Sequence, residues 1–183
     1  MMYETLLDMG RFLVMAGIVG LLAHVLGEAL PRTAFSYQKF PYKPYGWEQQ
    51  GKFYSKLAIE RWKNKLPDKS RVVKSTVEKS LRSSHGPAQM ERLIQETCVA
   101  ELVHWVLLII SPLFLLVLHT PVGILVTAIY GLSNLPFIMI QRYNRPRLVR
   151  MHDKLLKSGS ATVLKTTAVQ QKGGVCHEAA GTF

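Results

Sequence analysis

The stretch ELVHWVLLIISPLFLLVLH, residues 101–119, decides the fold class of this chain. After Glu101 and His104 it contains no ionisable residue until His119, and about 20 apolar residues are enough for a helix to cross a bilayer. Glu101 and His104 are three residues apart, so they share one face of that helix. Ionisable groups where a helix enters a membrane are costly and suggest function; the alternative is an ordinary helix-packing pair.

Two further apolar runs have about the same length, residues 12–30 and 122–140. The sequence therefore predicts an all-α membrane protein with three transmembrane helices, over about residues 12–30, 99–118 and 122–140. We expect Pro112 to kink the second helix. Residues 1–157 are expected to form a single membrane domain. Residues 158–183, rich in Gly, Thr and Gln, are expected to be a disordered tail.

The hydrophilic loop of residues 31–98 separates the first two predicted spans. The segment KFPYKPYGW, residues 39–47, has too much proline for a helix interior, and we expect it to run extended along the membrane surface. Residues 48–66 predict one amphipathic helix, ended by Pro67, with aromatic residues on one face and lysines on the other. Such a helix suits the lipid headgroup boundary; the alternative is packing on a thin soluble core.

The distribution of charge predicts the orientation in the membrane. The net charge is +11, with 14 of the 23 Lys and Arg in residues 32–98 and eight after Ile140. Because these residues flank the apolar runs, we interpret them as membrane topology signals rather than as a nucleic-acid surface. The positive-inside rule predicts a multi-pass protein of the cell membrane, with the loop and C-terminus cytoplasmic and the N-terminus external.

The sequence predicts no metal site and no bound cofactor. Neither of its two cysteines has a CxxC partner, so a thiolate metal cluster is not indicated. Glu101 and His104 lack a third metal ligand. His24 and Glu28 in the first span are the residues that could supply one.

The polar residues at the loop end of the spans suggest group transfer. Glu101 can fix the tautomer of His104 and leave its other ring nitrogen as a base. Arg142, Arg145 and Arg147 follow the third span and can hold a phosphate or carboxylate. Asn134 can donate to a developing oxyanion. Together they suit acyl transfer from the thioester of a phosphorylated acyl carrier to the hydroxyl of a membrane lipid.

Three blocks of sequence resemble the glycosyl-diaponeurosporenoate acyltransferases of staphyloxanthin carotenoid biosynthesis. The first block comprises Lys43-Pro44 through Glu48, Gly51-Lys52-Phe53 and Arg61-Trp62-Lys63-Asn64-Lys65. The second comprises Glu96-Thr97, Ala100-Glu101-Leu102 and His104-Trp105. The third comprises Asn134, Pro136 and the run QRYNRPRL, residues 141–148, which is the most specific of the three.

The resemblance covers roughly residues 30–150 and implies a small membrane protein that esterifies the sugar of a carotenoid glycoside with a fatty acyl chain. It offers no catalytic residues to carry over, so His104 and Glu101 rest on their chemistry. The blocks supply the remaining candidate substrate-binding residues, Lys52, Trp62, Tyr143 and Asn144. A non-catalytic lipid-binding scaffold or assembly partner is the alternative from a different functional class.

Overall fold

The computed structural model describes residues 2–63 and 86–175, with side chains up to residue 159. The predicted features of residues 64–85, including the end of the amphipathic helix at Pro67, lie outside the described residues. The parts of the chain that are described contain helices, turns and irregular segments but no strand.

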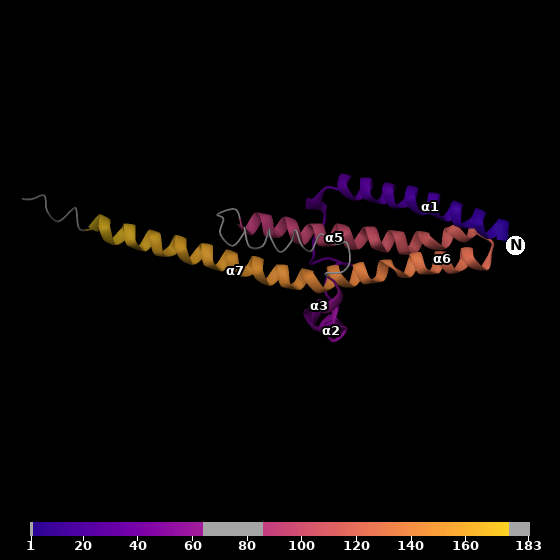
Figure 1. Ribbon diagram of the computed structural model, residues 1–183. Coiled ribbons are helices and arrows are strands. Elements are labelled where there is room, and N and C mark those ends of the chain that lie inside the picture. Colours follow the sequence, from indigo (N-terminus) through magenta and orange to yellow (C-terminus); the bar gives the residue numbers. More distant parts are fainter. Residues whose placement is uncertain (1, 64–85, 176–183) are drawn as a thin grey trace, which may run out of the picture.

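Three long helical stretches make up the membrane part of the protein (Figure 1). The first is α1, Met2–Ala29. The second is α5, Gly86–Ile110, continued by the 3-10 helix η4, Ser111–Leu116. The third is α6, Pro121–Leu132, followed after Ser133 by α7, Asn134–Val175. Each stretch is long and apolar enough to cross a membrane, which confirms the three predicted spans.

Pro112 ends the α-helical geometry of the second span. A proline lacks the N–H that would bond to the carbonyl four residues earlier, which here belongs to Leu108. The hydroxyl of Ser111 donates to that carbonyl instead, at 2.9 Å. The helix then tightens to the 3-10 form from Ser111. This substitution of one donor for another matters in a bilayer, where no water can satisfy the carbonyl.

Asp8 ties the first helix to the turn that joins the second and third spans. This buried carboxylate accepts hydrogen bonds from the backbone N–H groups of His119 and Thr120, at 3.1 and 3.0 Å, and from the Thr120 hydroxyl at 2.9 Å. Thr120 in turn caps α6 by accepting from the Gly123 N–H at 3.1 Å. One side chain of α1 thus satisfies the start of α6.

Arg32 makes the equivalent connection at the other end of α1. Its guanidinium donates to the carbonyls of Gly27 and Leu30, at 2.7 and 2.6 Å, and so caps the end of α1. It also donates to Glu96 of α5 at 2.9 Å. That hydrogen bond raises the pKa of Arg32. The end of α1 is therefore fixed to α5 a little over one turn before Glu101.

The predicted amphipathic helix over residues 48–66 is wrong in its continuity. The structure has three short helices there: η2, Gly46–Gly51, then α2, Lys52–Lys56, and α3, Ile59–Trp62. The backbone is left-handed at Gly51, with φ of 90°, and at Ala58, with φ of 51°. Left-handed residues interrupt a helix and change the direction of the chain, so the aromatic side chains do not share one straight helical face.

Part of the segment predicted to be a disordered tail, residues 158–183, belongs to a helix in the structure. Helix α7 continues to Val175, while residues 176–183 lie outside the described residues. The composition is rich in Gly and Thr, but there is no proline after Pro146 to stop a helix that has already formed. Figure 1 shows α7 running past the start of α5 in nearly the same direction as within the bundle.

Candidate active site

Glu101 lies at the centre of a buried charge network between α5 and α7. Its side chain is completely buried, and one oxygen accepts from Arg142 Nη1 at 2.6 Å while the other accepts from Arg145 Nη2 at 2.5 Å. The indole N–H of Trp105 lies 3.4 Å from the first oxygen. Arg142 and Arg145 are three residues apart on α7, so they share the face that packs on α5.

Arg142 extends this network to the segment before α2. Its Nε donates to Glu48 at 2.5 Å, and its Nη groups donate to the carbonyls of Pro41 and Lys43, at 3.0 and 3.3 Å. The ring of Tyr45 lies 4.6 Å from the guanidinium carbon. Every edge of this planar cation therefore faces a protein partner, which is the geometry of a structural arginine.

Arg145 is equally enclosed. It is 2% exposed and donates to the hydroxyl and carbonyl oxygens of Thr97 and to the carbonyl of Tyr42, at 2.9 to 3.0 Å. A phosphate could reach Arg142 or Arg145 only by displacing these partners. The geometry therefore favours a positioning role for both arginines over the anion clamp expected from the sequence.

Tyr54 donates to the same oxygen of Glu48 as Arg142 does. Its hydroxyl donates to Glu48 at 2.6 Å, and the second Glu48 oxygen accepts from the Tyr45 backbone N–H at 3.0 Å. Burial raises the pKa of Tyr54, and the bond to Glu48 raises it further. The phenol therefore stays protonated at any physiological pH. Two carboxylates and two guanidiniums thus form an electroneutral group with closely matched hydrogen bonds.

His104 lies one helical turn deeper than Glu101 and has a different environment. Its Nδ1 is 3.0 Å from Oδ1 of Asn134, and its ring stacks on Phe137 at a centroid distance of 4.6 Å. The ring is half-buried. The amide oxygen of Asn134 can only accept, so the contact implies a proton on Nδ1 and makes Nε2 the basic nitrogen. The sequence assigned this orienting role to Glu101.

Asn134 is itself fixed at the start of α7. Its Nδ2 donates to the carbonyls of Tyr130 and Gly131, at 2.9 and 3.3 Å. The amide nitrogen is thus directed at backbone acceptors at the end of α6. The geometry favours Asn134 as the residue that positions His104, rather than as a donor to an oxyanion.

A second group of candidate residues lies on another face of α7. The hydroxyl of Tyr143 donates to Glu60 of α3, and Arg147 covers the Tyr143 ring, with its guanidinium carbon 3.4 Å from the ring centroid. Arg147 also reaches Glu60 at 3.3 Å but remains partly exposed. Trp62 packs against the buried cluster that includes Tyr143 and donates to the Leu57 carbonyl at 3.1 Å. Of the three predicted clamp arginines, only Arg147 is open to a ligand.

Two candidates are not brought to either group. Lys52 lies exposed at the start of α2, and Asn144 is half-buried on α7 between the two faces. The structure shows no hydrogen bond from the side chain of either residue to another described candidate. Within the described part of the chain, no three His, Cys, Asp or Glu side chains lie close enough to hold a metal ion.

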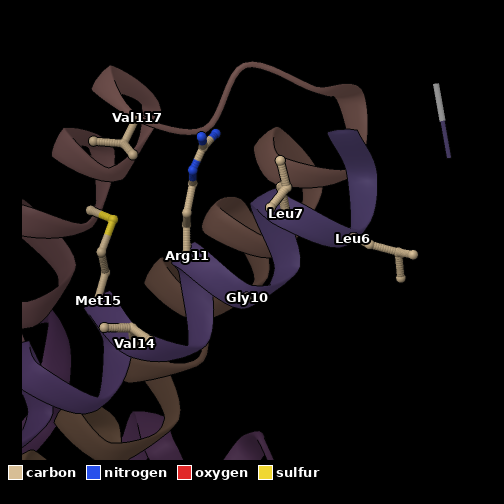
Figure 2. Close-up of a pocket in the computed structure, with 7 residues that line it drawn as sticks. All are labelled: Leu6, Leu7, Gly10, Arg11, Val14, Met15 and Val117. Atoms are coloured by element: carbon tan, nitrogen blue, oxygen red, sulfur yellow. The ribbon is translucent and has the colours of Figure 1, made fainter. Parts of the chain in front are cut away.

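Two hollows of the described surface lie at different ends of the bundle. A tight recess beside the charge network is lined by Tyr42, Pro44, Glu48, Arg142, Arg145 and Pro146. An open apolar groove of about 390 Å³ is lined by Leu6, Leu7, Gly10, Arg11, Val14, Met15 and Val117 (Figure 2). This groove lies at the other end of the spans and contains none of the predicted site residues.

Sequence reasoning missed the roles of Glu48, Thr97 and Tyr54. Glu48 and Thr97 stand within the blocks that carry the family resemblance, which was the available signal. Their partners on α7 are 94 and 48 residues away in the chain, so no local spacing could reveal these contacts.

Comparison with known proteins identifies the family. Residues 38–154 match the family model described as glycosyl-4,4'-diaponeurosporenoate acyltransferase. Enzymes of that name from Staphylococcus aureus strains MRSA252 and N315 are 29% and 28% identical to the chain over 136 residues. In both cases the match covers 73% of this chain and 81% of the relative. No solved structure matches the chain.

The matched region contains η2, α2, α3, α5 and α6, the charge network and the His104–Asn134 pair. It ends on α7 beyond Arg147. The names of the family and of these relatives decide between the two functional classes left open by the sequence, in favour of an enzyme. This chain belongs to the glycosyl-4,4'-diaponeurosporenoate acyltransferase family and is an acyltransferase.

Proposed function

We propose that the protein transfers a fatty acyl group from an acyl thioester to a sugar hydroxyl of a glycosylated carotenoid held in the membrane. The observation that carries this proposal is the family match, which includes every residue of the site. The three spans add a physical reason, because an acceptor with a long apolar chain and a polar sugar places its hydroxyl at the membrane boundary. The donor is proposed to arrive from the cytoplasm, as the positive-inside rule favours.

His104 is the general base in this proposal, and Asn134 positions it. The Nδ1–H is held by Asn134, so Nε2 takes the proton of the sugar hydroxyl as its oxygen attacks the thioester carbonyl. The new C–O ester bond forms, the C–S bond breaks, and the proton passes from His104 to the leaving thiolate. No covalent acyl-enzyme is required, and no metal or bound cofactor takes part.

The charge network and the exposed cation have separate roles in this scheme. Glu101, Arg142, Arg145 and Glu48 hold α5, α7 and the preceding loop in register, so that His104 and Asn134 face each other. Arg147 is the proposed contact for the phosphate of the acyl carrier, with Tyr143 beneath it. Lys52, Trp62 and Asn144 remain proposed contacts for the donor or acceptor.

Lipid mass spectrometry tests the reaction directly. Cells that make the glycosylated carotenoid are compared with and without the protein, and the carotenoid fraction is examined for an added fatty acyl mass. We expect that mass with the wild-type chain and its loss with His104→Gln, which keeps polarity and approximate size but cannot act as the base. An inserted, stable His104→Gln protein that acylates at the wild-type rate would refute the mechanism; no added mass on any glycolipid would refute the function.

A further inference from the structure

We propose that three clustered aromatic side chains, Tyr45, Trp47 and Phe53, form a membrane-seated patch. This aromatic patch inserts into the lipid headgroup layer at the loop end of the bundle, and the lysines around it bind anionic phospholipid headgroups. The proposal concerns a lipid surface and does not depend on the reaction proposed above.

The aromatic patch is exposed and contiguous. Trp47 is 56% exposed, and Tyr45 and Phe53 are exposed as well. The rings of Tyr45 and Trp47 are stacked with centroids 6.2 Å apart, and Phe53 meets Trp47 edge-on at 5.1 Å. Contiguous apolar surface of this kind, unlike scattered single residues, marks a binding surface.

The patch is held in a fixed shape from below. Tyr54 is buried beneath it and contacts both Trp47 and Phe53, with ring centroids 6.1 and 5.6 Å away. Tyr54 also bonds to Glu48, the residue next to Trp47. The outward direction of the three rings is therefore set by buried contacts.

The patch lies at the depth where the third span leaves the apolar layer. Beneath it, Tyr54 and Ile59 pack on Ile140 and Tyr143 of α7, and the apolar run of this span ends at Ile140. Gly51 approaches so closely that an added Cβ would lie 3.4 Å from the Tyr143 carbonyl oxygen. In Figure 1, α2 and α3 project sideways from α7 rather than along the bundle axis. Trp and Tyr are enriched at this depth in membrane proteins.

Charge complementarity identifies the occupant as a lipid surface. Exposed lysines stand on both sides of the patch in the sequence, at positions 39, 43, 52 and 56. None of them makes an ion pair with a residue that the structure describes. The two described acids of this segment already have cationic partners, since Glu48 binds Arg142 and Glu60 binds Arg147. Exposed aromatic rings flanked in the sequence by exposed lysines, which have no ion pair among the described residues, match the headgroup layer of anionic lipid.

Tryptophan fluorescence tests the proposal without requiring turnover. The full chain carrying Trp62→Phe and Trp105→Phe keeps Trp47 as its only tryptophan. It is reconstituted into vesicles of phosphatidylglycerol and phosphatidylcholine that carry a nitroxide either at the headgroup or at the end of the acyl chain. We expect blue-shifted emission, stronger quenching by the headgroup nitroxide than by the deep one, and weak quenching by aqueous acrylamide. Lys52→Gln with Lys56→Gln should reduce the headgroup quenching only when phosphatidylglycerol is present.

Two outcomes overturn the proposal. Free access of acrylamide to Trp47, with no quenching by either nitroxide, would place the patch in water. Protection from acrylamide that disappears on dilution with excess lipid, again without nitroxide quenching, would identify a second copy of the chain as the occupant. If the double Phe variant does not fold, the difference in quenching between the wild type and Trp47→Phe gives the quenching of Trp47 alone.

Discussion

Glu101 and His104 stand one turn apart on the same helix, yet their environments assign them different tasks. Glu101 is fully enclosed by two guanidiniums, so its carboxylate stabilises the packing of α5 on α7. His104 is half-buried and held through Nδ1 by Asn134. The residues with chemistry available to a substrate are therefore fewer than the polar residues that define the site.

A double-mutant cycle tests whether Asn134 acts through His104. We expect His104→Gln to lower the acylation rate by about a hundredfold or more. Asn134→Ala removes one positioning hydrogen bond, worth about 1 kcal/mol, and should lower the rate by several-fold to about tenfold. In the His104→Gln background, Asn134→Ala should cause no further loss, because the residue it positions is gone. Independent, multiplying effects on kcat would show that Asn134 has a separate role.

Removing the charge of Glu101 should lower the free energy of unfolding more than removing the charge of a partly exposed residue nearby. Glu101→Gln leaves Arg142 and Arg145 without a shared counter-charge, and breaking a buried pair typically costs about 3–5 kcal/mol. Arg147→Gln is the matched control, since exposed pairs contribute about 1 kcal/mol or less. Thermal unfolding of the two purified variants in detergent measures both effects. Equal unfolding temperatures would contradict a stabilising role for the charge network.

The sequence identifies the residues of this site better than their partners. Ionisable groups inside apolar runs are rare, which is why Glu101 and His104 could be recognised. The arginines could be recognised by their density directly after the third run. A spacing of three residues permits a Glu101–His104 contact but does not specify it. Arg142, which binds Glu101, is 41 residues further along the chain, so the pairing depends on how α5 and α7 pack.

Among the elements, the long helices could be predicted and the short ones could not. Twenty apolar residues have few stable forms in a bilayer, because backbone groups must bond within the segment. The segment of residues 46–62 has no such constraint, and its shape depends on where Gly51 meets α7. A periodicity of three and four residues therefore suggested one helix where the chain folds back twice.

Gly51 is required by the backbone conformation. Its φ of 90° is unfavourable for residues with a Cβ, and a left-handed conformation costs such residues about 1–2 kcal/mol. We expect Gly51→Ala to lower the unfolding temperature and to loosen the contact of η2 with α7. Gly46→Ala is the control, because an added Cβ there meets no atom within 4 Å. Equal stability of the two variants would contradict this role.

Asp8 should matter for the attachment of α1. Asp8→Ala removes an acceptor for two backbone N–H groups and a hydroxyl, and hydrogen bonds to charged groups contribute about 1.5–3 kcal/mol each. Glu4→Ala, an exposed position on the same helix, should change stability by less than about 0.5 kcal/mol. Protease sensitivity of the turn at His119 provides the measurement. We expect faster cleavage only in Asp8→Ala. Unchanged cleavage would refute the proposed role of Asp8 in holding α1 to this turn.

At the scale of the whole molecule, the ends of the three spans separate into two sides. Figure 1 shows the start of α1 beside the turn that joins α5 to α6 at one end of the bundle, with α2, α3 and the start of α5 toward the other end. The charge network joins the segment before α2 to α5 and α7 and so lies toward that second end. Most of the Lys and Arg outside residues 64–85 belong to the segments at the second end, residues 32–63 and those after Ile140. The fold thus places the candidate active site on the side that the positive-inside rule assigns to the cytoplasm.

Cysteine labelling of intact cells tests this orientation. Cys98 is buried and needs no replacement, whereas Cys176 is changed to serine. We expect a membrane-impermeant maleimide to label Glu4→Cys in intact cells and Lys157→Cys only after the membrane is permeabilised. Labelling of position 157 in intact cells would show that the C-terminal side is external, which is the opposite of the expected orientation.

The electroneutral group of Glu48, Glu101, Arg142 and Arg145 has a consequence for how the chain is made. Its two acids precede its two bases in the sequence, separated by most of the second span and all of the third. A nascent chain that ends before residue 142 therefore presents Glu101 beside the bilayer with neither of its guanidinium partners. We therefore expect the second span to reach its final packing only after the ribosome has completed α7 through residue 145, so the committing step in assembly follows the synthesis of the third span.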